Sequence, residues 1–211
     1  MTLAFSLPAI YPITDTRISV LSHLEQMRKL IEGGAKFVQL RDKTAGADEF
    51  YRDAKESIEF AHDHAVRVVI NDRVDIAMAV GADGVHLGQD DLPVEAAREL
   101  LGPDRIIGFS THSIDQLKIA TTLAVDYLAF GPIFSTETKS DTEPVVGLTG
   151  LGQAQIIAGE IPLVAIGGIN AANIRDVIAT GAHSAAVISA VLAPPDSISA
   201  NLKSLFSRIA N

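Results

Sequence analysis

The chain has 211 residues, of which 47% are hydrophobic and 20% charged, and it contains no cysteine. This composition is typical of an ordinary globular protein, excludes disulfides and thiolate metal sites, and predicts one domain over residues 1–211. The formal net charge of −9 argues against nucleic acid or an anionic membrane as partner. The sequence begins without a signal-peptide pattern, and no apolar run is long enough to cross a bilayer, so a cytoplasmic protein is expected.

Short runs rich in valine, isoleucine and leucine alternate with longer segments of helical period, which predicts a parallel sheet buried on both faces. The predicted strands are Ala9–Thr14, Phe37–Arg41, Arg67–Asn71, Gly84–Leu87, Ile106–Ser110, Tyr127–Phe130, Leu163–Ile166 and Ala185–Ile188. The predicted helices are Leu21–Glu32, Asp48–His64, Arg73–Val80, Pro93–Leu101, Ile114–Ala124, Gly150–Gly159, Asn173–Thr180 and Asp196–Ala210. This order predicts a closed (β/α)8 TIM barrel of the α/β class. The alternative is an open doubly wound sheet, which usually carries a glycine-rich turn after its first strand that this chain lacks.

Several predicted boundaries carry local signals of their own. Pro93 suits the first turn of a helix, where no backbone donor is needed. Ser113 is expected to cap the helix that follows it, and Gly181 to stand where a helix ends. No linker, low-complexity tract or charge block divides the chain, which again favours a single domain.

Charged residues follow the second, third and fourth predicted strands, at the end of a barrel where the chemistry lies. Arg41 and Lys43 supply the local positive charge that a phosphate ligand needs in a chain of negative net charge. Asp72 and Asp91 follow neighbouring strands, which lie about 4.8 Å apart, and paired carboxylates at that distance suit Mg²⁺. The alternatives are that the cations are solvated surface groups and that the aspartates cap helices.

Further polar groups follow the later strands. Ser135–Lys139 combines hydroxyl groups, a carboxylate and an ammonium, which suits an anionic substrate with Lys139 as a point charge on a phosphate; the alternative is an exposed polar loop. Gly167 and Gly168 allow a phosphate to approach the backbone closely, or serve a tight turn. His112 is either an acid–base group or a structural residue. His86, inside a predicted strand, is expected to be a satisfied core histidine.

Segments from the first strand to beyond the seventh resemble those of thiamine-phosphate synthases, a family of (β/α)8 barrels that join the pyrimidine and thiazole halves of thiamine. The matching segments are YPITD (11–15), VQLRDK (38–43), INDR (70–73), GVHLGQDD (84–91), GFSTH (108–112), FGPIFSTETK (130–139) and AIGGI (165–169). The chain departs from the family pattern at Ser135, where proline is usual, and at Asp90, where glutamate is usual. Neither position has a role in the activity that the resemblance implies.

The resemblance implies three groups of site residues. The pyrimidine diphosphate would be bound by Gln39, Leu40, Arg41, Asp42, Lys43, Asn71, Ser110 and Lys139, of which Arg41, Lys43, Ser110 and Lys139 are catalytic. The thiazole phosphate would be bound by Thr136, Glu137, Thr138, Gly168, Ile188 and Ser189. The cofactor would be Mg²⁺ on Asp72 and Asp91.

The resemblance also implies small-molecule substrates and a reaction in which diphosphate leaves before the thiazole nitrogen attacks. The segment Gly131–Thr149 is long enough to act as a lid. Two other functions stay open: a related isomerase that tautomerises a thiazole carboxylate phosphate through the histidine equivalent to His112, and a non-catalytic phosphate-ligand binder. The cations, the paired aspartates and Thr136–Lys139 favour the synthase. A homo-oligomer is allowed by the sequence but not specified by it.

Overall fold

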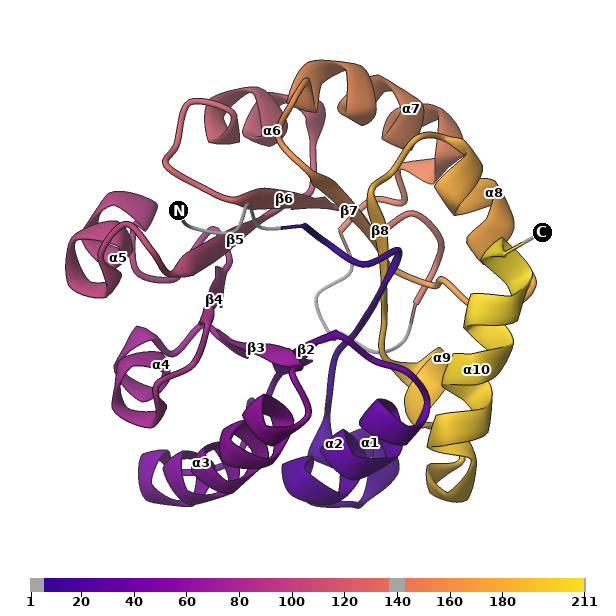
Figure 1. Ribbon diagram of the computed structural model, residues 1–211. Coiled ribbons are helices and arrows are strands. Elements are labelled where there is room, and N and C mark those ends of the chain that lie inside the picture. Colours follow the sequence, from indigo (N-terminus) through magenta and orange to yellow (C-terminus); the bar gives the residue numbers. More distant parts are fainter. Residues whose placement is uncertain (1–5, 137–142, 211) are drawn as a thin grey trace.

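The computed structural model describes residues 6–136 and 143–210, and its strands form one parallel sheet that curves into a barrel (Figure 1). The strands are β1 (Ile10–Pro12), β2 (Phe37–Leu40), β3 (Arg67–Asn71), β4 (Gly84–Leu87), β5 (Ile106–Thr111), β6 (Tyr127–Phe130), β7 (Leu163–Ile166) and β8 (Ser184–Val187). They lie in the order β1-β8-β7-β6-β5-β4-β3-β2. A parallel bridge between Ile13 and Gln39 closes the ring, with the Thr14 amide donating to the Gln39 carbonyl at 2.9 Å. The predicted TIM barrel is therefore confirmed.

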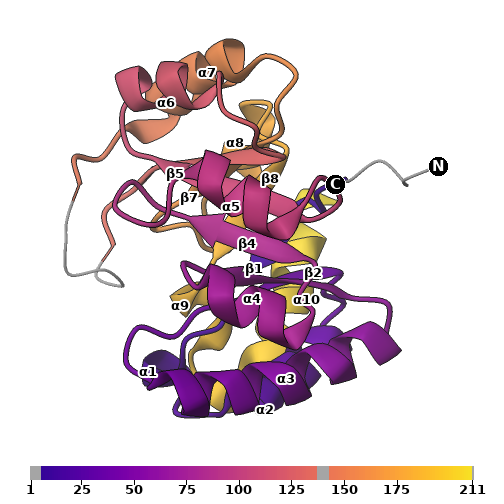
Figure 2. The same cartoon turned by 90° about the vertical axis from the view of Figure 1, so that its left-hand side faces the viewer.

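Helices follow the strands and form a ring outside them (Figure 1). They are α1 (Thr16–Ser19), α2 (His23–Glu32), α3 (Ala47–Asp63), α4 (Val74–Val80), α5 (Val94–Leu101), α6 (Ile114–Ala120), α7 (Gly147–Ala158), α8 (Ile174–Ala179), α9 (Ser189–Leu192) and α10 (Ile198–Ile209), with a 3₁₀ turn η1 (Pro195–Ser197). Figure 2 shows α2 and α3 together on one side of the barrel and α6 and α7 together on the other. In the described residues no helix is both long and apolar enough to span a membrane.

The helix ends follow from local chemistry. Ser22 and Glu25 form a reciprocal cap at the start of α2, with the Ser22 hydroxyl accepting from the Glu25 amide at 3.2 Å. Ser113 caps α6 by accepting from the Gln116 amide, as the sequence predicts. Pro93 stands just before α5 rather than in its first turn. Gly181, with a φ of 97°, follows the end of α8 as expected.

The core has two layers, because the strands are buried on both faces. The outer layer lies between the strands and the helices. The inner layer fills the barrel with residues that include Tyr11, Phe37 and Tyr127, whose rings meet edge to face. Phe37 and Tyr127 are the first residues of their strands, so they close the barrel toward the amino ends. Polar groups are therefore left to the carboxyl ends.

Candidate active site

Three charged side chains from neighbouring strand ends meet at the carboxyl end of the barrel. Lys43, after β2, forms an ion pair with the carboxylate of Asp72, after β3. Asp91, after β4, accepts from the Gly88 amide at 2.7 Å. Burial and the adjacent Asp72 carboxylate raise the pKa of Asp91, although the Gly88 amide and Lys43 oppose that shift. The two carboxylates that the sequence assigns to a metal are therefore neighbours in the fold.

The backbone at Asp72 is held in an unusual conformation. Its φ of 61° lies in the left-handed region, which costs an L-residue about 1–2 kcal/mol. The Asp72 amide donates to the His86 carbonyl at 2.8 Å, and this bond to the next strand helps to hold the turn. A strained backbone of this kind persists only where surrounding contacts support it, and such strain is concentrated at functional sites.

The donor set of this cluster suits a hard divalent cation. Mg²⁺ commonly takes one or two carboxylates from the protein and completes its shell with water and substrate phosphates. Asp72 and Asp91 supply two adjacent carboxylates, and burial together with Asp72 raises the pKa of Asp91 in spite of the nearby Lys43. Over residues 6–136 and 143–210 no group of three or more histidine, aspartate or glutamate side chains gathers as an all-protein metal cage. The residues therefore fit a cation shared with a phosphorylated ligand.

Arg41 lies deeper in the barrel mouth than Lys43. It is buried, and its Nη1 forms an ion pair with the buried carboxylate of Asp15. Burial lowers the pKa of Arg41, and the Asp15 charge opposes that shift. Asp15 also caps α1, where its Oδ1 accepts from the Arg17 amide at 3.0 Å. The YPITD segment thus fixes the position of the arginine that the sequence assigns to a phosphate.

A small polar cavity opens at the carboxyl end of the barrel interior. Gln39, Arg41, Asn71 and Ser110 line it, together with apolar side chains such as Ile166. The Asn71 Nδ2 is buried and donates no hydrogen bond to any group in the described part of the chain. A buried donor without a partner is costly, and a ligand acceptor in the cavity would satisfy it. Four side chains predicted for the pyrimidine diphosphate therefore share one cavity.

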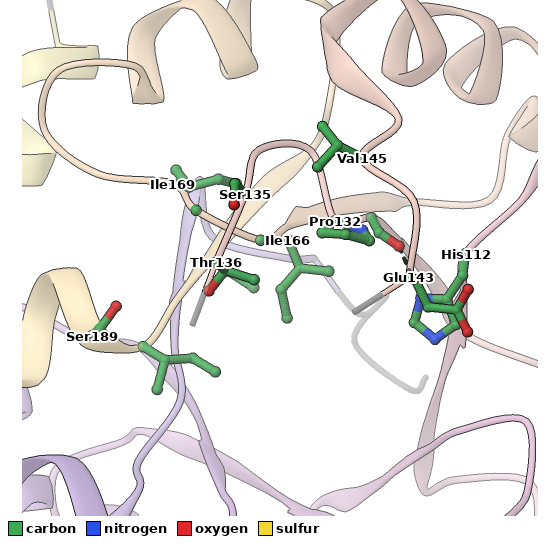
Figure 3. A pocket seen from close by; sticks show the side chains of 14 residues that line it. His112, Pro132, Ser135, Thr136, Glu143, Val145, Ile166, Ile169 and Ser189 are labelled. Atoms are coloured by element: carbon green, nitrogen blue, oxygen red, sulfur yellow. Dashed lines mark hydrogen bonds between the residues drawn. The ribbon is translucent and has the colours of Figure 1, made fainter. Parts of the chain in front are cut away.

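A larger pocket of about 800 Å³, part of it open to solvent, lies beside the first (Figure 3). Thr136, Gly168, Ile188 and Ser189 line it, and these are the described members of the set predicted for the thiazole phosphate. Ser189 is the first residue of α9. The two cavities share three wall residues, Ile166, Ala186 and Ile188.

The two glycines after β7 allow two loops to pack closely. Gly167 and Gly168 have φ values of 104° and 65°. A Cβ at Gly167 would lie 2.6 Å from the Pro132 Cα, and one at Gly168 would lie 2.6 Å from the Ser135 carbonyl oxygen. The Phe134 amide donates to the Gly167 carbonyl at 3.0 Å. The glycines thus bring the segment after β6 against the segment after β7, and this contact forms a wall of the larger pocket.

Some lining residues were not assigned to the site from the sequence. Glu143 and Val145 line the larger pocket from the segment before α7, and His112 lines it from the end of β5 (Figure 3). The His112 Nδ1 lies 2.8 Å from the Gly131 carbonyl, which can only accept, so this nitrogen carries the proton. The neutral ring then has an unprotonated Nε2. The GFSTH segment pointed to His112, but nothing in the sequence pointed to Glu143.

Two predicted residues lie apart from both the charged cluster and the two cavities. Leu40 is fully buried in the outer core layer. The Asp42 carboxylate accepts from the Thr16 hydroxyl at 2.9 Å and from the Ala45 amide at 2.8 Å, and its contact with His23 lowers its pKa. Neither side chain lines the two cavities described above. Both stabilise the strand end that presents their neighbours, and their assignment to the ligand stays a prediction.

The remaining predicted residues, Glu137, Thr138 and Lys139, lie outside the described residues. The segment predicted as a lid is also described only in part, and α7 begins at Gly147, three residues before the predicted start. A closed barrel with polar and charged side chains at the carboxyl ends of its strands defines the class, an α/β-barrel enzyme acting on small molecules.

Comparison with known proteins identifies the family. A family model described as thiamine monophosphate synthase matches residues 10–191. A thiamine-phosphate synthase of Methanospirillum hungatei is 46% identical over 195 residues, covering 92% of this chain and 94% of that protein. One of Syntrophomonas wolfei is 46% identical, covering 89% of this chain and 90% of that protein. The structure of a thiamine phosphate pyrophosphorylase from Pyrococcus furiosus matches at a TM-score of 0.86 and 38% identity, covering 95% of both chains. The chain belongs to the thiamine monophosphate synthase family, as the resemblance of its segments predicts.

Proposed function

We propose that the protein joins an aminopyrimidine, whose exocyclic methylene carries a diphosphate, to a thiazole that carries a phosphate. The products are thiamine phosphate and diphosphate. The names and the high coverage of its relatives support this activity. The observation in the fold that carries the proposal is the common wall of the two cavities, formed by Ile166, Ala186 and Ile188. Because the two cavities adjoin at these residues, substrates bound in them would lie side by side, which is the positioning that a bimolecular reaction needs.

The smaller cavity is proposed to hold the pyrimidine diphosphate. Gln39, Asn71 and Ser110 would hydrogen-bond to it, and Arg41 and Lys43 would neutralise its charge. Lys139, from the segment after β6, would add a third cation. These contacts reconcile an anionic substrate with a chain of net charge −9.

Asp72 and Asp91 are proposed to hold Mg²⁺ on the diphosphate. Their adjacent carboxylates and the raised pKa of Asp91 support this assignment. When bound, the cation supplies positive charge to the leaving diphosphate. Lys43, already paired with Asp72, would then turn toward the substrate.

The larger pocket is proposed to hold the thiazole phosphate. Its phosphate would contact Gly168, Ile188 and Ser189, and Thr136 would contact the ligand as well. Glu137 and Thr138, which lie outside the described residues, stay part of the predicted set. The apolar wall shared with the smaller cavity would keep water away from the reacting carbon.

The reaction needs no side-chain nucleophile. The C–O bond to the diphosphate would break first, with the bonding electrons leaving on oxygen, and the ring amino group would stabilise the resulting pyrimidinylmethyl cation. The thiazole nitrogen would then attack that carbon with its lone pair. The work of the protein is to hold both partners and to balance the charge of the departing diphosphate.

The test is a two-product assay. Purified protein is incubated with both substrates, with and without Mg²⁺, and thiamine phosphate and diphosphate are measured together. The proposal predicts that both products appear in equal amounts and only with the cation. Binding of the thiazole phosphate without product would instead identify a phosphate-ligand binder, and conversion of a thiazole carboxylate phosphate to its tautomer, without diphosphate release, would identify an isomerase.

A further inference from the structure

A continuous chain of hydrogen bonds crosses the barrel interior. The Gln39 Nε2 donates to the Tyr11 hydroxyl at 2.6 Å, and that hydroxyl lies 2.8 Å from the hydroxyl of Tyr127. The Tyr127 hydroxyl lies 2.8 Å from the His86 Nδ1, and the His86 Nε2 lies 2.8 Å from the Ser110 Oγ. All five side chains are buried. They come from β2, β1, β6, β4 and β5, so the chain connects opposite sides of the barrel.

The chemistry of the groups gives this chain one direction. The Gln39 amide nitrogen can only donate, so the Tyr11 oxygen accepts. Burial raises the pKa of both tyrosine hydroxyls, which keeps them protonated. In the described part of the chain the second hydrogen-bond partner of the Tyr11 hydroxyl is Tyr127, which therefore receives the Tyr11 proton. If each link runs the same way, Tyr127 donates to the His86 Nδ1, and the His86 Nε2–H donates to Ser110.

Both end groups of the chain, Gln39 and Ser110, line the smaller cavity beside Arg41, and Tyr11 and His86 line it as well. A serine hydroxyl rotates freely unless a neighbour fixes it, and it can then either donate or accept. With His86 donating to its oxygen, Ser110 must send its own proton elsewhere, and the cavity lies on that side. With its nitrogen held by Tyr11, Gln39 has a fixed amide orientation.

We propose that Tyr11, Tyr127 and His86 are positioning residues, which orient the Gln39 amide and make Ser110 a fixed hydrogen-bond donor to an anionic oxygen of the ligand. The nature of that ligand rests on the proposed function. A donor that is already oriented needs no rearrangement when charge develops on the leaving group, and this is the basis of electrostatic preorganisation. Tyr127 lies outside the lining of the smaller cavity, whereas Tyr11 and His86 form part of it; in this scheme all three act on the ligand through Gln39 and Ser110.

Gly108, which lies next to this chain of hydrogen bonds, supports the view that the arrangement is specific. Gly108 of β5 pairs in register with His86 on one side and with Tyr127 on the other. A Cβ at Gly108 would lie 2.0 Å from the Tyr127 Cζ. Only a residue without a side chain therefore lets Tyr127 cross β5 and reach His86, against which its ring stacks at 5.5 Å. This geometry explains the glycine that stands two residues before Ser110 in GFSTH.

The first test needs no substrate. In ¹⁵N-labelled protein at neutral pH, histidine ring correlations in NMR spectra show which nitrogen carries the proton, and loss of one set of signals in His86→Asn assigns the residue. The proposal predicts a neutral His86 ring protonated at Nε2. A ring protonated at Nδ1, or at both nitrogens, would reverse the chain and overturn the proposal. This result stands even if the assay for thiamine phosphate fails, so the two proposals fail separately.

The second test is a double-mutant cycle. Tyr127→Phe removes one oxygen and keeps the ring, and it should lower kcat about tenfold, the effect of losing one oriented bond to a charged group. The KM for the thiazole phosphate should stay unchanged. In the Ser110→Ala background the same substitution should cause no further loss, because it acts through Ser110. Losses that multiply would mark a merely structural role.

Tyr51→Phe is the matched control, since Tyr51 is the third tyrosine of the chain and lies on α3 outside both cavities. It should behave as the unmodified protein. If Tyr127→Phe fails to fold, Tyr11→Phe breaks the same chain one link earlier, and the NMR measurement on the unmodified protein decides the direction of the protons without either variant.

Discussion

Asp91→Asn should separate stability from activity in this protein. The substitution keeps an oxygen that can accept from the Gly88 amide, a bond of 2.7 Å in the structure. It replaces the carboxylate that faces Asp72 by an amide that can donate to it. The variant should therefore unfold at a higher temperature than the unmodified protein without Mg²⁺, while it loses most of its turnover.

The size of the stability gain follows from the pKa of Asp91. Burial and the Asp72 carboxylate raise the pKa of Asp91 in the folded state. At pH values between the ordinary carboxyl pKa of about 4 and this raised pKa, the folded state therefore binds more protons than the unfolded state. Stability is lost as pH rises through that window, and the penalty is complete above it. Solvent screens these partly exposed charges, which limits the gain from Asp91→Asn to about 1 kcal/mol. In a domain of this length that corresponds to about 2–4 °C in Tm.

The assay is thermal unfolding at neutral pH and near pH 4, with and without Mg²⁺, beside steady-state kinetics. The gain in Tm should be present at neutral pH and vanish near pH 4. Mg²⁺ at ten times its Kd should stabilise the unmodified protein by about 1.4 kcal/mol and leave the variant unchanged. Turnover should fall on the order of 100-fold or more, since charge stabilisation by a metal is worth several kcal/mol.

Asp90→Asn is the control, because it removes the same charge from an exposed neighbouring position. It should change neither the response to Mg²⁺ nor turnover. Two results would refute both the pairing of the carboxylates and their assignment to a metal. One is an Asp91→Asn variant that unfolds at a lower temperature than the unmodified protein, and the other is a variant that keeps its response to Mg²⁺.

Three further substitutions test other parts of the site. Lys139→Ala should lower kcat more than tenfold and change Tm by less than about 1 °C, because it removes a charge contact with the leaving group; equal activity with a lower Tm would mark the lysine as structural. Gly168→Ala should raise the KM for the thiazole phosphate and lower the free energy of unfolding by about 1–2 kcal/mol, because Gly168 has a φ of 65° and a Cβ there would meet Ser135. Gly152→Ala is the control, since Gly152 has open space around it, and it should cause neither change. Asp15→Asn should lower the free energy of unfolding, measured with denaturant, by about 3 kcal/mol, because it removes the charge that compensates the buried Arg41. A decrease below about 1 kcal/mol would contradict this role of Asp15.

The barrel could be predicted from the sequence because its strands are buried on both faces. Each predicted strand overlaps an observed one, and β3, β4, β6 and β7 have the predicted bounds. The signal is a run of apolar residues that stands out from the polar helices around it. The short helices α1 and α9 were missed, since four residues are too few to show a period. Gly150 was predicted as the start of α7, which begins at Gly147, because glycines carry little information on where a helix starts.

The site could be predicted only as far as chain order implies spatial neighbours. Asp72 and Asp91 follow adjacent strands of a parallel sheet, so their meeting follows from the fold alone. The contribution of Glu143 to the larger pocket depends on how the segment before α7 folds back, and no local pattern encodes that path. Asp42 lies among predicted site residues in the chain, and its carboxylate caps the following loop, which chain order alone does not reveal.

The charges at the barrel mouth support the proposal that a cation accompanies the diphosphate. Of the described residues assigned to the site, Arg41 is paired with Asp15 and Lys43 is paired with Asp72. Among these same residues Asp91 forms no ion pair of its own. Arg17 also pairs with Asp15, at 3.4 Å, so three cations face three carboxylates, and a diphosphate entering alone would meet no excess of positive charge. A divalent ion on the paired aspartates, as proposed, would reverse that balance and would leave Lys43 free to contact the substrate. On the proposed function, the same carboxylates that raise the negative charge of the chain would make its mouth selective for an anion that arrives with a metal.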